Sequence, residues 1–242
     1  MSVTRIDEDE ESSVKLPATR IDILSLFPEY FRGPFDESMI MQARKKGLLD
    51  IHLVNIRDFA DNKHRRVDDR PYGGGPGMVL MPDPVSKAIH SVKTSKARVI
   101  YLSPQGKKLT AAKCRELAAY SHLILLCGHY EGIDQRVIDQ EIDEEISIGD
   151  YVLTNGCLAA IVLVDACVRF IPGVLGHELA AAEDSFENGQ LDCPHYTRPE
   201  VFNGQTVPAV LLSGDHQKIA LWRKTTAFKI TQQIRPDLLE ND

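Results

Sequence analysis

The segment 147–161, SIGDYVLTNGCLAAI, constrains the fold of this chain more than any other part of its sequence. A short apolar run over 146–153 is interrupted by a Gly-Asp pair, and Asn155 and Gly156 turn the chain into the apolar stretch 158–170. Glycine and asparagine visit left-handed backbone conformations, and glycine lets a ligand approach the main chain. The pattern predicts a bent backbone that offers its own N–H and C=O groups as a binding surface. A strand-turn-helix corner without a ligand fits the pattern equally well.

The rest of the chain alternates between short apolar runs and helical patterns, which indicates an α/β domain with a mostly parallel sheet. Runs typical of buried strands cover residues 21–27, 51–56, 97–102, 122–127 and 146–153. Patterns typical of helices cover 36–46, 83–92, 110–120, 158–170 and 216–235. Asp83 and Pro84 are expected to be the N-cap and first residue of the second helix. Glycine-containing turns follow three strands. In open α/β sheets ligands bind beyond the carboxyl ends of the strands, so these turns predict a cofactor pocket built mostly of backbone.

Residues 57–81 contain many Gly, Asp and Arg residues and few apolar ones, so we expect a long surface loop there. The run 73–75 of three glycines is not part of a G-x-x-x-x-G-K-[ST] pattern, which makes a nucleotide-phosphate site the weaker interpretation. A flexible hinge and a loop that covers substrate are the remaining alternatives.

Hydrophobic residues make up 43% of the 242 positions, which is enough for a packed core. There is no charged-then-apolar leader, and the apolar stretches are shorter than the roughly 20 residues that span a bilayer. We therefore expect a protein that does not enter a membrane. Five cysteines without a C-x-x-C pair argue against a disulfide framework and a zinc site, and they favour reduced thiols in a cytoplasmic protein.

Six motifs of this chain resemble those of a known family. In chain order they are YLSPQG, CGHYEGIDQR, IGDYVLTNG, RFIPGVLGHE, EDSF and LDCPHYTRPEVFNG. They are similar to the bacterial tRNA (guanine-N1)-methyltransferases, the TrmD family of the SPOUT superfamily, from about residue 21 to the C-terminus. The resemblance implies a SPOUT-type, mostly parallel sheet with a C-terminal trefoil knot, followed by a small helical domain.

The resemblance and the composition together predict that the chain is divided into four parts. Residues 1–19 are expected to be a disordered acidic tail, and 20–175 a SPOUT methyltransferase domain. Residues 176–186 are expected to be a linker, and 187–242 a C-terminal helical tRNA-binding domain.

The reaction implied by the resemblance transfers a methyl group from S-adenosyl-L-methionine to N1 of the guanosine immediately 3′ of the tRNA anticodon. This reaction needs a base for the N1 proton and a positive charge near O6. The resemblance assigns these roles to Asp184 and Arg169. The residues predicted to contact the cofactor are Tyr101, Leu102, Ser103, Gly106, Gly128, Tyr130, Glu131, Ile148, Gly149, Asp150, Tyr151, Val152, Leu153, Asn155 and Gly156. No residues are predicted to hold a metal, and a requirement for Mg²⁺ is left open.

The third turn departs from the family pattern at three positions. Asn155 stands at a usual glycine, Cys157 at a usual glutamate and Ala159 at a usual proline. Loss of the proline loosens the turn, so these changes bear on cofactor affinity. Two alternatives remain: another SPOUT RNA methyltransferase, such as one acting on ribose, or a non-catalytic RNA-binding protein that kept the fold.

The net charge of −7 counts against a nucleic-acid-binding protein, but the charge is unevenly distributed. The stretch 216–235 contains five Lys and Arg residues and no acid, and we expect Arg223, Lys224 and Lys229 to contact tRNA rather than DNA. The resemblance also implies a homodimer. We expect its active site to combine the cofactor turns of one chain with Asp184 of the other.

Overall fold

A five-stranded parallel sheet forms the centre of the structure, a computed structural model that describes residues 18–175 and 184–240. The strand order is β2-β1-β6-β5-β7, and every pairing in this sheet is parallel. Its strands are β1 (Thr19–Ser25), β2 (Leu49–Asn55), β5 (Ala97–Lys108), β6 (His122–Cys127) and β7 (Glu144–Ser147). The predicted α/β class and mostly parallel sheet are therefore confirmed, whereas the trefoil knot stays a prediction.

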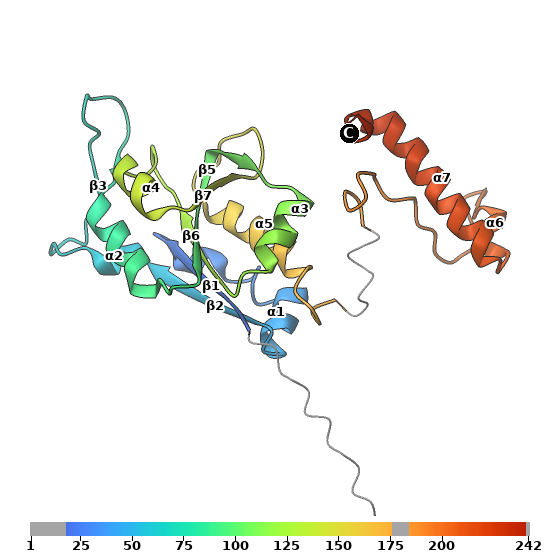
Figure 1. The fold of residues 1–242 in the computed structure, drawn as a ribbon, viewed down its shortest axis with the longest axis horizontal. Coiled ribbons are helices and arrows are strands. Elements are labelled where there is room, and N and C mark those ends of the chain that lie inside the picture. The colour runs from blue at the N-terminus through green and yellow to red at the C-terminus, as the bar shows by residue number, and fades with distance from the viewer. Residues whose placement is uncertain (1–17, 176–183, 241–242) are drawn as a thin grey trace, which may run out of the picture.

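Helices cover both faces of the sheet, so both faces are apolar. Figure 1 shows α2 (Pro82–Val92) and α4 (Gln135–Glu141) on one face. On the other face lie α1 (Ser38–Lys45), α3 (Ala111–Ala118), α5 (Cys157–Val168) and the short helix η1 (Pro28–Phe31). Successive residues of β6 point to opposite faces, as the pleat requires. Leu123 and Leu125 join the core under α5, and Ile124 and Leu126 join the core under α2.

The loop predicted over 57–81 is largely irregular, but it is anchored more firmly than its composition indicates. It follows η2 (Ile56–Phe59) and contains an antiparallel pair, β3 (Asp68–Asp69) and β4 (Val79–Leu80). Val67 and Leu80 are fully buried. The Leu80 N–H donates to the Gly132 carbonyl at 3.0 Å, so the loop is held against the turn that follows β6.

Most sequence-based boundaries differ from the observed ones by one or two residues; β1, for example, spans Thr19–Ser25 rather than 21–27. The predicted strand 146–153 ends at Ser147, because Gly149 adopts a φ of +155° and breaks the extended chain. The helix expected to start after Asp83 begins at Pro82 instead, with Met81 as N-cap. The strand predicted to stop at 102 runs to Lys108, because residues 103–106 bulge out of the pairing: both Leu102 and Lys107 pair with Ile146.

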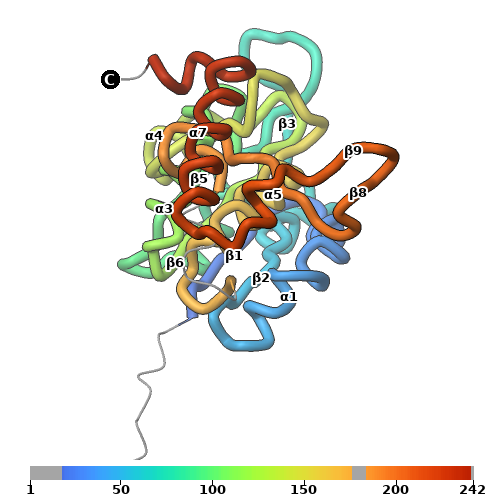
Figure 2. Tube along the Cα trace, turned by 90° about the vertical axis from the view of Figure 1, so that its right-hand side faces the viewer, coloured from blue at the N-terminus to red at the C-terminus, as the bar shows by residue number. Residues whose placement is uncertain are grey.

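The described C-terminal part has a short hairpin, two α-helices and a short 3-10 helix. The hairpin of β8 (Val201–Phe202) and β9 (Gln205–Thr206) projects outward in Figure 2. It is followed by α6 (Ala209–Leu212), α7 (His216–Ile234) and η3 (Pro236–Leu239). Figure 1 shows α6 and α7 apart from the sheet. The helix expected over 216–235 is confirmed to within one residue. The acidic tail lies almost wholly outside the described residues, as does most of the linker, and the domain boundaries stay predictions.

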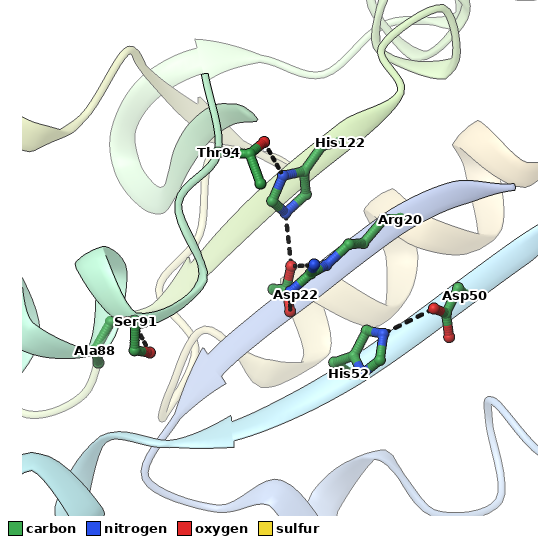
Figure 3. Close-up of polar contacts among 8 residues, drawn as sticks. All are labelled: Arg20, Asp22, Asp50, His52, Ala88, Ser91, Thr94 and His122. Atoms are coloured by element: carbon green, nitrogen blue, oxygen red, sulfur yellow. Dashed lines mark hydrogen bonds and ion pairs between the residues drawn. The ribbon is translucent and has the colours of Figure 1, made fainter. Parts of the chain in front are cut away.

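A buried polar network joins the beginnings of β1 and β6 (Figure 3). Asp22 is fully buried and binds His122 Nε2 at 2.6 Å, while Arg20 forms two further hydrogen bonds to the same carboxylate. His122 Nδ1 lies 2.8 Å from the Thr94 hydroxyl. A buried carboxylate needs such partners, so this network fixes the edge of the sheet opposite the turns described below. In the part of the chain that is described, no helix is both long and apolar enough to cross a bilayer.

Candidate active site

The three predicted turns meet at the carboxyl ends of β5, β6 and β7, where they enclose a cavity of about 220 Å³. Predicted cofactor residues that line it are Tyr101, Leu102, Ser103, Gly128, Tyr130, Glu131, Ile148, Gly149, Tyr151, Val152, Leu153, Asn155 and Gly156. Lining residues that were not predicted are Pro104, His129, Gly132, Ile146, Ser147, Thr154 and Ala159. These are mostly neighbours of predicted residues in the same turns, and counting whole turns would have found them.

Two predicted cofactor residues do not line the cavity. Gly106 faces β7, where an added Cβ would lie 2.4 Å from the backbone nitrogen of Ile146. Asp150 points to solvent and forms an ion pair with Lys108 at 2.8 Å. Gly106 thus serves the close contact between two strands, and Asp150 neutralises a surface lysine.

The first turn is the bulge of β5. The Gln105 N–H donates to the Ser103 hydroxyl at 3.1 Å, which closes the bulge locally. Tyr101, at the base of the turn, is 6% exposed. Burial, together with the nearby charge of Glu145, raises the pKa of Tyr101 to about 12, so the phenol stays neutral at physiological pH.

The second turn follows β6 and carries backbone strain. Tyr130 adopts a φ of +59°, which is uncommon for an aromatic residue, and the residue is 43% exposed and lines the cavity. The Glu131 N–H donates to the Met78 carbonyl at 3.0 Å, so the 57–81 loop braces this turn. His129 packs edge-on against Phe27 and Tyr130. Its Nδ1 atom is buried and has no hydrogen-bond partner among the described residues.

The third turn differs from expectation. Asn155 and Gly156 were expected to use left-handed conformations, but neither has a positive φ. The Asn155 Oδ1 atom accepts a hydrogen bond from the Cys157 N–H at 2.8 Å and so stabilises the first turn of α5. Gly156 is needed for close contact: its N–H donates to the Gly128 carbonyl at 2.9 Å, and a Cβ would lie 2.9 Å from the Cys127 Cα. The sharp bend is made by Gly149.

Buried thiols lie directly beneath the cavity. Cys157 begins α5 and contacts Cys127, the last residue of β6. A hydrogen bond with Cys127 lowers the pKa of the Cys157 thiol, and the same bond together with burial raises the pKa of Cys127 well above its usual value. All five cysteines are free and buried.

Arg169 and Asp184 form an ion pair at the opposite end of α5. Arg169 is the C-cap of that helix, and neither residue lines the cavity. Ala159, which does line it, precedes Arg169 by ten residues, and an α-helix rises 1.5 Å per residue. About 15 Å along the helix axis therefore separates the cavity from the predicted catalytic pair of the same chain.

The predicted tRNA contacts Arg223, Lys224 and Lys229 are exposed on α7. None of them forms an ion pair within the described part of the chain, so their charges face solvent. Across the same residues, no group of three His, Cys, Asp or Glu side chains is arranged to hold a metal ion.

Comparison with known proteins gives consistent similarities. A family model described as tRNA (Guanine-1)-methyltransferase TrmD matches residues 19–241. A Protochlamydia amoebophila protein named tRNA (guanine-N(1)-)-methyltransferase is 74% identical over 219 residues, which cover 90% of this chain and 99% of that protein. Proteins of the same name from Chlamydia trachomatis serovar D and Chlamydia pneumoniae are each 60% identical. These two matches include 90% and 92% of the present chain, respectively. They include only 62% and 61% of the length of the two Chlamydia proteins, so the present chain spans less than two thirds of each.

Proposed function

This chain belongs to the tRNA (guanine-1)-methyltransferase family and methylates N1 of guanine in tRNA, and we propose that S-adenosylmethionine is the methyl donor, held in the cavity between the three turns. The observation that supports this most strongly is the convergence of the three turns on one backbone-lined cavity at the carboxyl edge of a parallel sheet.

The lining of the cavity fits this cofactor. The exposed rings of Tyr130 and Tyr151 offer aromatic surface to an adenine. The buried, unpartnered Nδ1 of His129 offers a hydrogen-bonding atom that a ribose or amino group would satisfy. Backbone N–H and C=O groups of the glycine-rich turns supply the remaining polar contacts. When bound, the sulfonium of the cofactor supplies an already activated methyl group, so the protein contributes position and electrostatics.

Asp184 and Arg169 are proposed to act on the guanine. The Asp184 carboxylate takes the N1 proton, and the Arg169 guanidinium stabilises the negative charge that develops on O6. Their ion pair holds the two groups next to each other before substrate binds. We further propose that the target is the guanosine immediately 3′ of the anticodon and that the exposed Arg223, Lys224 and Lys229 of α7 contact the tRNA backbone. DNA is not a proposed partner, and the proposed location is the cytoplasm.

We propose that a second copy of the chain completes the site. Within one chain, about 15 Å of helix separates the catalytic pair from the cavity. Methyl transfer requires reacting atoms about 3–3.5 Å apart. Three residues of α5 and its C-cap form an exposed stripe at helical spacing: Leu158, Val162, Asp165 and Arg169. Leu158 and Val162 are 42% and 45% exposed, although they are apolar. An antiparallel α5 from a second copy would cover this stripe and bring Arg169 and Asp184 of each chain to the cavity of the other.

The test combines cofactor binding with nucleoside mapping. We expect calorimetry to detect binding of S-adenosylmethionine and mass spectrometry to find 1-methylguanosine 3′ of the anticodon of a tRNA transcript. A transcript with adenosine at that position should remain unmodified. Absence of cofactor binding would favour a non-catalytic RNA-binding protein, and a methyl group on ribose would favour another SPOUT enzyme.

Replacement of the proposed base gives a sharper test. Asp184→Asn should lower the methylation rate by about 10²- to 10⁴-fold, the usual contribution of a general base, and should leave cofactor affinity unchanged. Glu200→Gln, which neutralises an exposed carboxylate of the same C-terminal part, is the matched control and should retain the wild-type rate. A near wild-type rate in Asp184→Asn would rule out the assigned base.

A further inference from the structure

We propose that Arg115 on α3 is a positioning residue that holds the turn carrying Asp184 in its working place. This inference rests on the proposed role of Asp184 as the base. Arg115 contacts two groups that lie next to the catalytic pair, one on each side. Both contacts come from a helix that contributes nothing to the cavity itself.

The first contact is with the residue that follows Arg169. The Arg115 guanidinium lies 5.2 Å from the centre of the Phe170 ring, a cation–π arrangement. Phe170 packs against the main core, and α3 packs on α5. Arg115 is therefore fixed to the same end of α5 that carries Arg169.

The second contact is with the turn that carries the base. Arg115 forms an ion pair with Glu187, whose side chain is only 3% exposed. The Arg115 side chain is itself 53% exposed, so only the carboxylate of this pair is buried. Removing Arg115 would leave that buried carboxylate without a positive partner, which costs free energy. The Glu187 N–H donates to the Asp184 carbonyl at 3.3 Å, which makes residues 184–187 a single turn. This turn is thus held at one end by Arg169 and at the other by Arg115.

The Arg169–Asp184 pair alone is a weak restraint. Its side chains are 46% and 42% exposed, and exposed ion pairs contribute little because water screens them. Proton transfer requires the base to be held within about 0.5 Å of its productive position.

The other side of the turn is attached to α7 rather than to the sheet. The Leu191 N–H donates to the Thr231 hydroxyl at 2.9 Å, and the Arg235 guanidinium lies 5.9 Å from the centre of the Phe186 ring. Arg115 therefore attaches the turn to the methyltransferase domain through a carboxylate that is almost fully buried.

The experiment measures kcat, cofactor affinity and tRNA affinity for Arg115→Ala, Arg115→Lys and Glu187→Ala in the full-length protein. We expect Arg115→Ala and Glu187→Ala to lower kcat by about 10- to 100-fold, the penalty of a misplaced catalytic group. The dissociation constants for S-adenosylmethionine and tRNA should change by less than about threefold, because neither ligand is proposed to contact Arg115. Arg115→Lys keeps the charge and should recover part of the rate. Arg44 lies on α1 and forms an exposed ion pair with Asp36, so Arg44→Ala is the matched control, with a wild-type rate expected.

A double-mutant cycle separates positioning from general structural support. If Arg115 acts through Asp184, Arg115→Ala should cause no further loss of kcat in an Asp184→Asn background. An equal fold loss in both backgrounds would overturn the inference, and so would a wild-type kcat in Arg115→Ala. A wild-type rate in Asp184→Asn alone would instead overturn the proposed function. If Arg115→Ala does not fold, Arg115→Lys and Glu187→Ala are put through the same cycle and decide by the same criteria.

Discussion

Gly156 is required for close packing rather than for an unusual backbone conformation. Its φ of −78° is open to any residue, yet a Cβ there would lie 2.9 Å from both the Cys127 Cα and the Gly128 nitrogen. Both neighbours are backbone atoms, which cannot rotate away as a side chain would. The third turn of the cavity is therefore held to the second at a distance that only glycine permits.

Gly156→Ala should push these two turns apart and disturb the cavity between them. We expect a loss of about 1–3 kcal/mol in unfolding free energy, the usual cost of overpacking, and at least a tenfold weaker affinity for S-adenosylmethionine. Gly204→Ala is the control: its φ is +78° and a Cβ would meet nothing within 4 Å. It should cost about 1–2 kcal/mol of backbone strain without changing cofactor affinity. Equal affinities in the two variants, by calorimetry, would contradict this account.

The residue types of the turns could be predicted, but their conformations could not. Asn155 and Gly156 were expected to adopt left-handed backbone conformations. The sequence alone shows only which conformations a residue type can adopt, not which one it takes in the fold. The residues of the turns with positive φ are instead Tyr130, Gly132 and Gly149. Tyr130 is held there by a turn whose next residue, Glu131, bonds to the 57–81 loop. Such a conformation is imposed by contacts between segments about fifty residues apart, which no local pattern contains.

Strands and helices were predicted best where their ends depend on local signals. β6 was predicted to the residue, and Thr110 caps α3 through its side chain as expected. The ends of β5 and β7 next to the cavity were mispredicted, because there the bulge 103–106 and the bend at Gly149 interrupt the pairing between the two strands. The polar network at the opposite edge was missed altogether, since its members come from β1, β6 and the loop between α2 and β5.

His122→Ala should show how much that network stabilises the sheet. The substitution removes a hydrogen bond from the fully buried Asp22 and leaves a cavity, so we expect a loss of about 2–4 kcal/mol in urea unfolding. His52 forms a similar pair with Asp50 on the neighbouring strand (Figure 3). The His52 side chain, however, is 48% exposed. His52→Ala should therefore cost less than about 1 kcal/mol. Similar losses for the two variants would mean that burial of the Asp22 carboxylate is not the cause.

At the scale of the whole molecule, the sequence motifs identified the residues of the site but not their distribution in space. Resemblance assigned both the cavity turns and the Arg169–Asp184 pair to one reaction, and a single folded chain holds them at opposite ends of α5. The length of α5 sets the distance between these two groups. The sequence pattern predicts that distance only after a role has been assigned to the residues at each end of the helix. That separation, with the exposed apolar residues Leu158 and Val162 on the same helix, is what favours a homodimer.

Mixed dimers provide the last test. One chain carries Asp184→Ala, and the other carries Tyr130→Ala with Gly149→Trp, which damages the cavity. If each site uses the cavity of one chain and Asp184 of the other, a mixed dimer has one intact site and one with both lesions. Random mixing should then restore about a quarter of the wild-type rate, because about half of the dimers are mixed and each has one working site.

Each variant mixed with itself is the control and should stay inactive, and differently tagged chains would verify that mixed dimers form. A mixture that contains mixed dimers yet shows no methylation would mean that cavity and base act within one chain. In that case α5 could not lie between them as the structure has it, and Asp184 would have to reach the cavity through a rearrangement of its own turn.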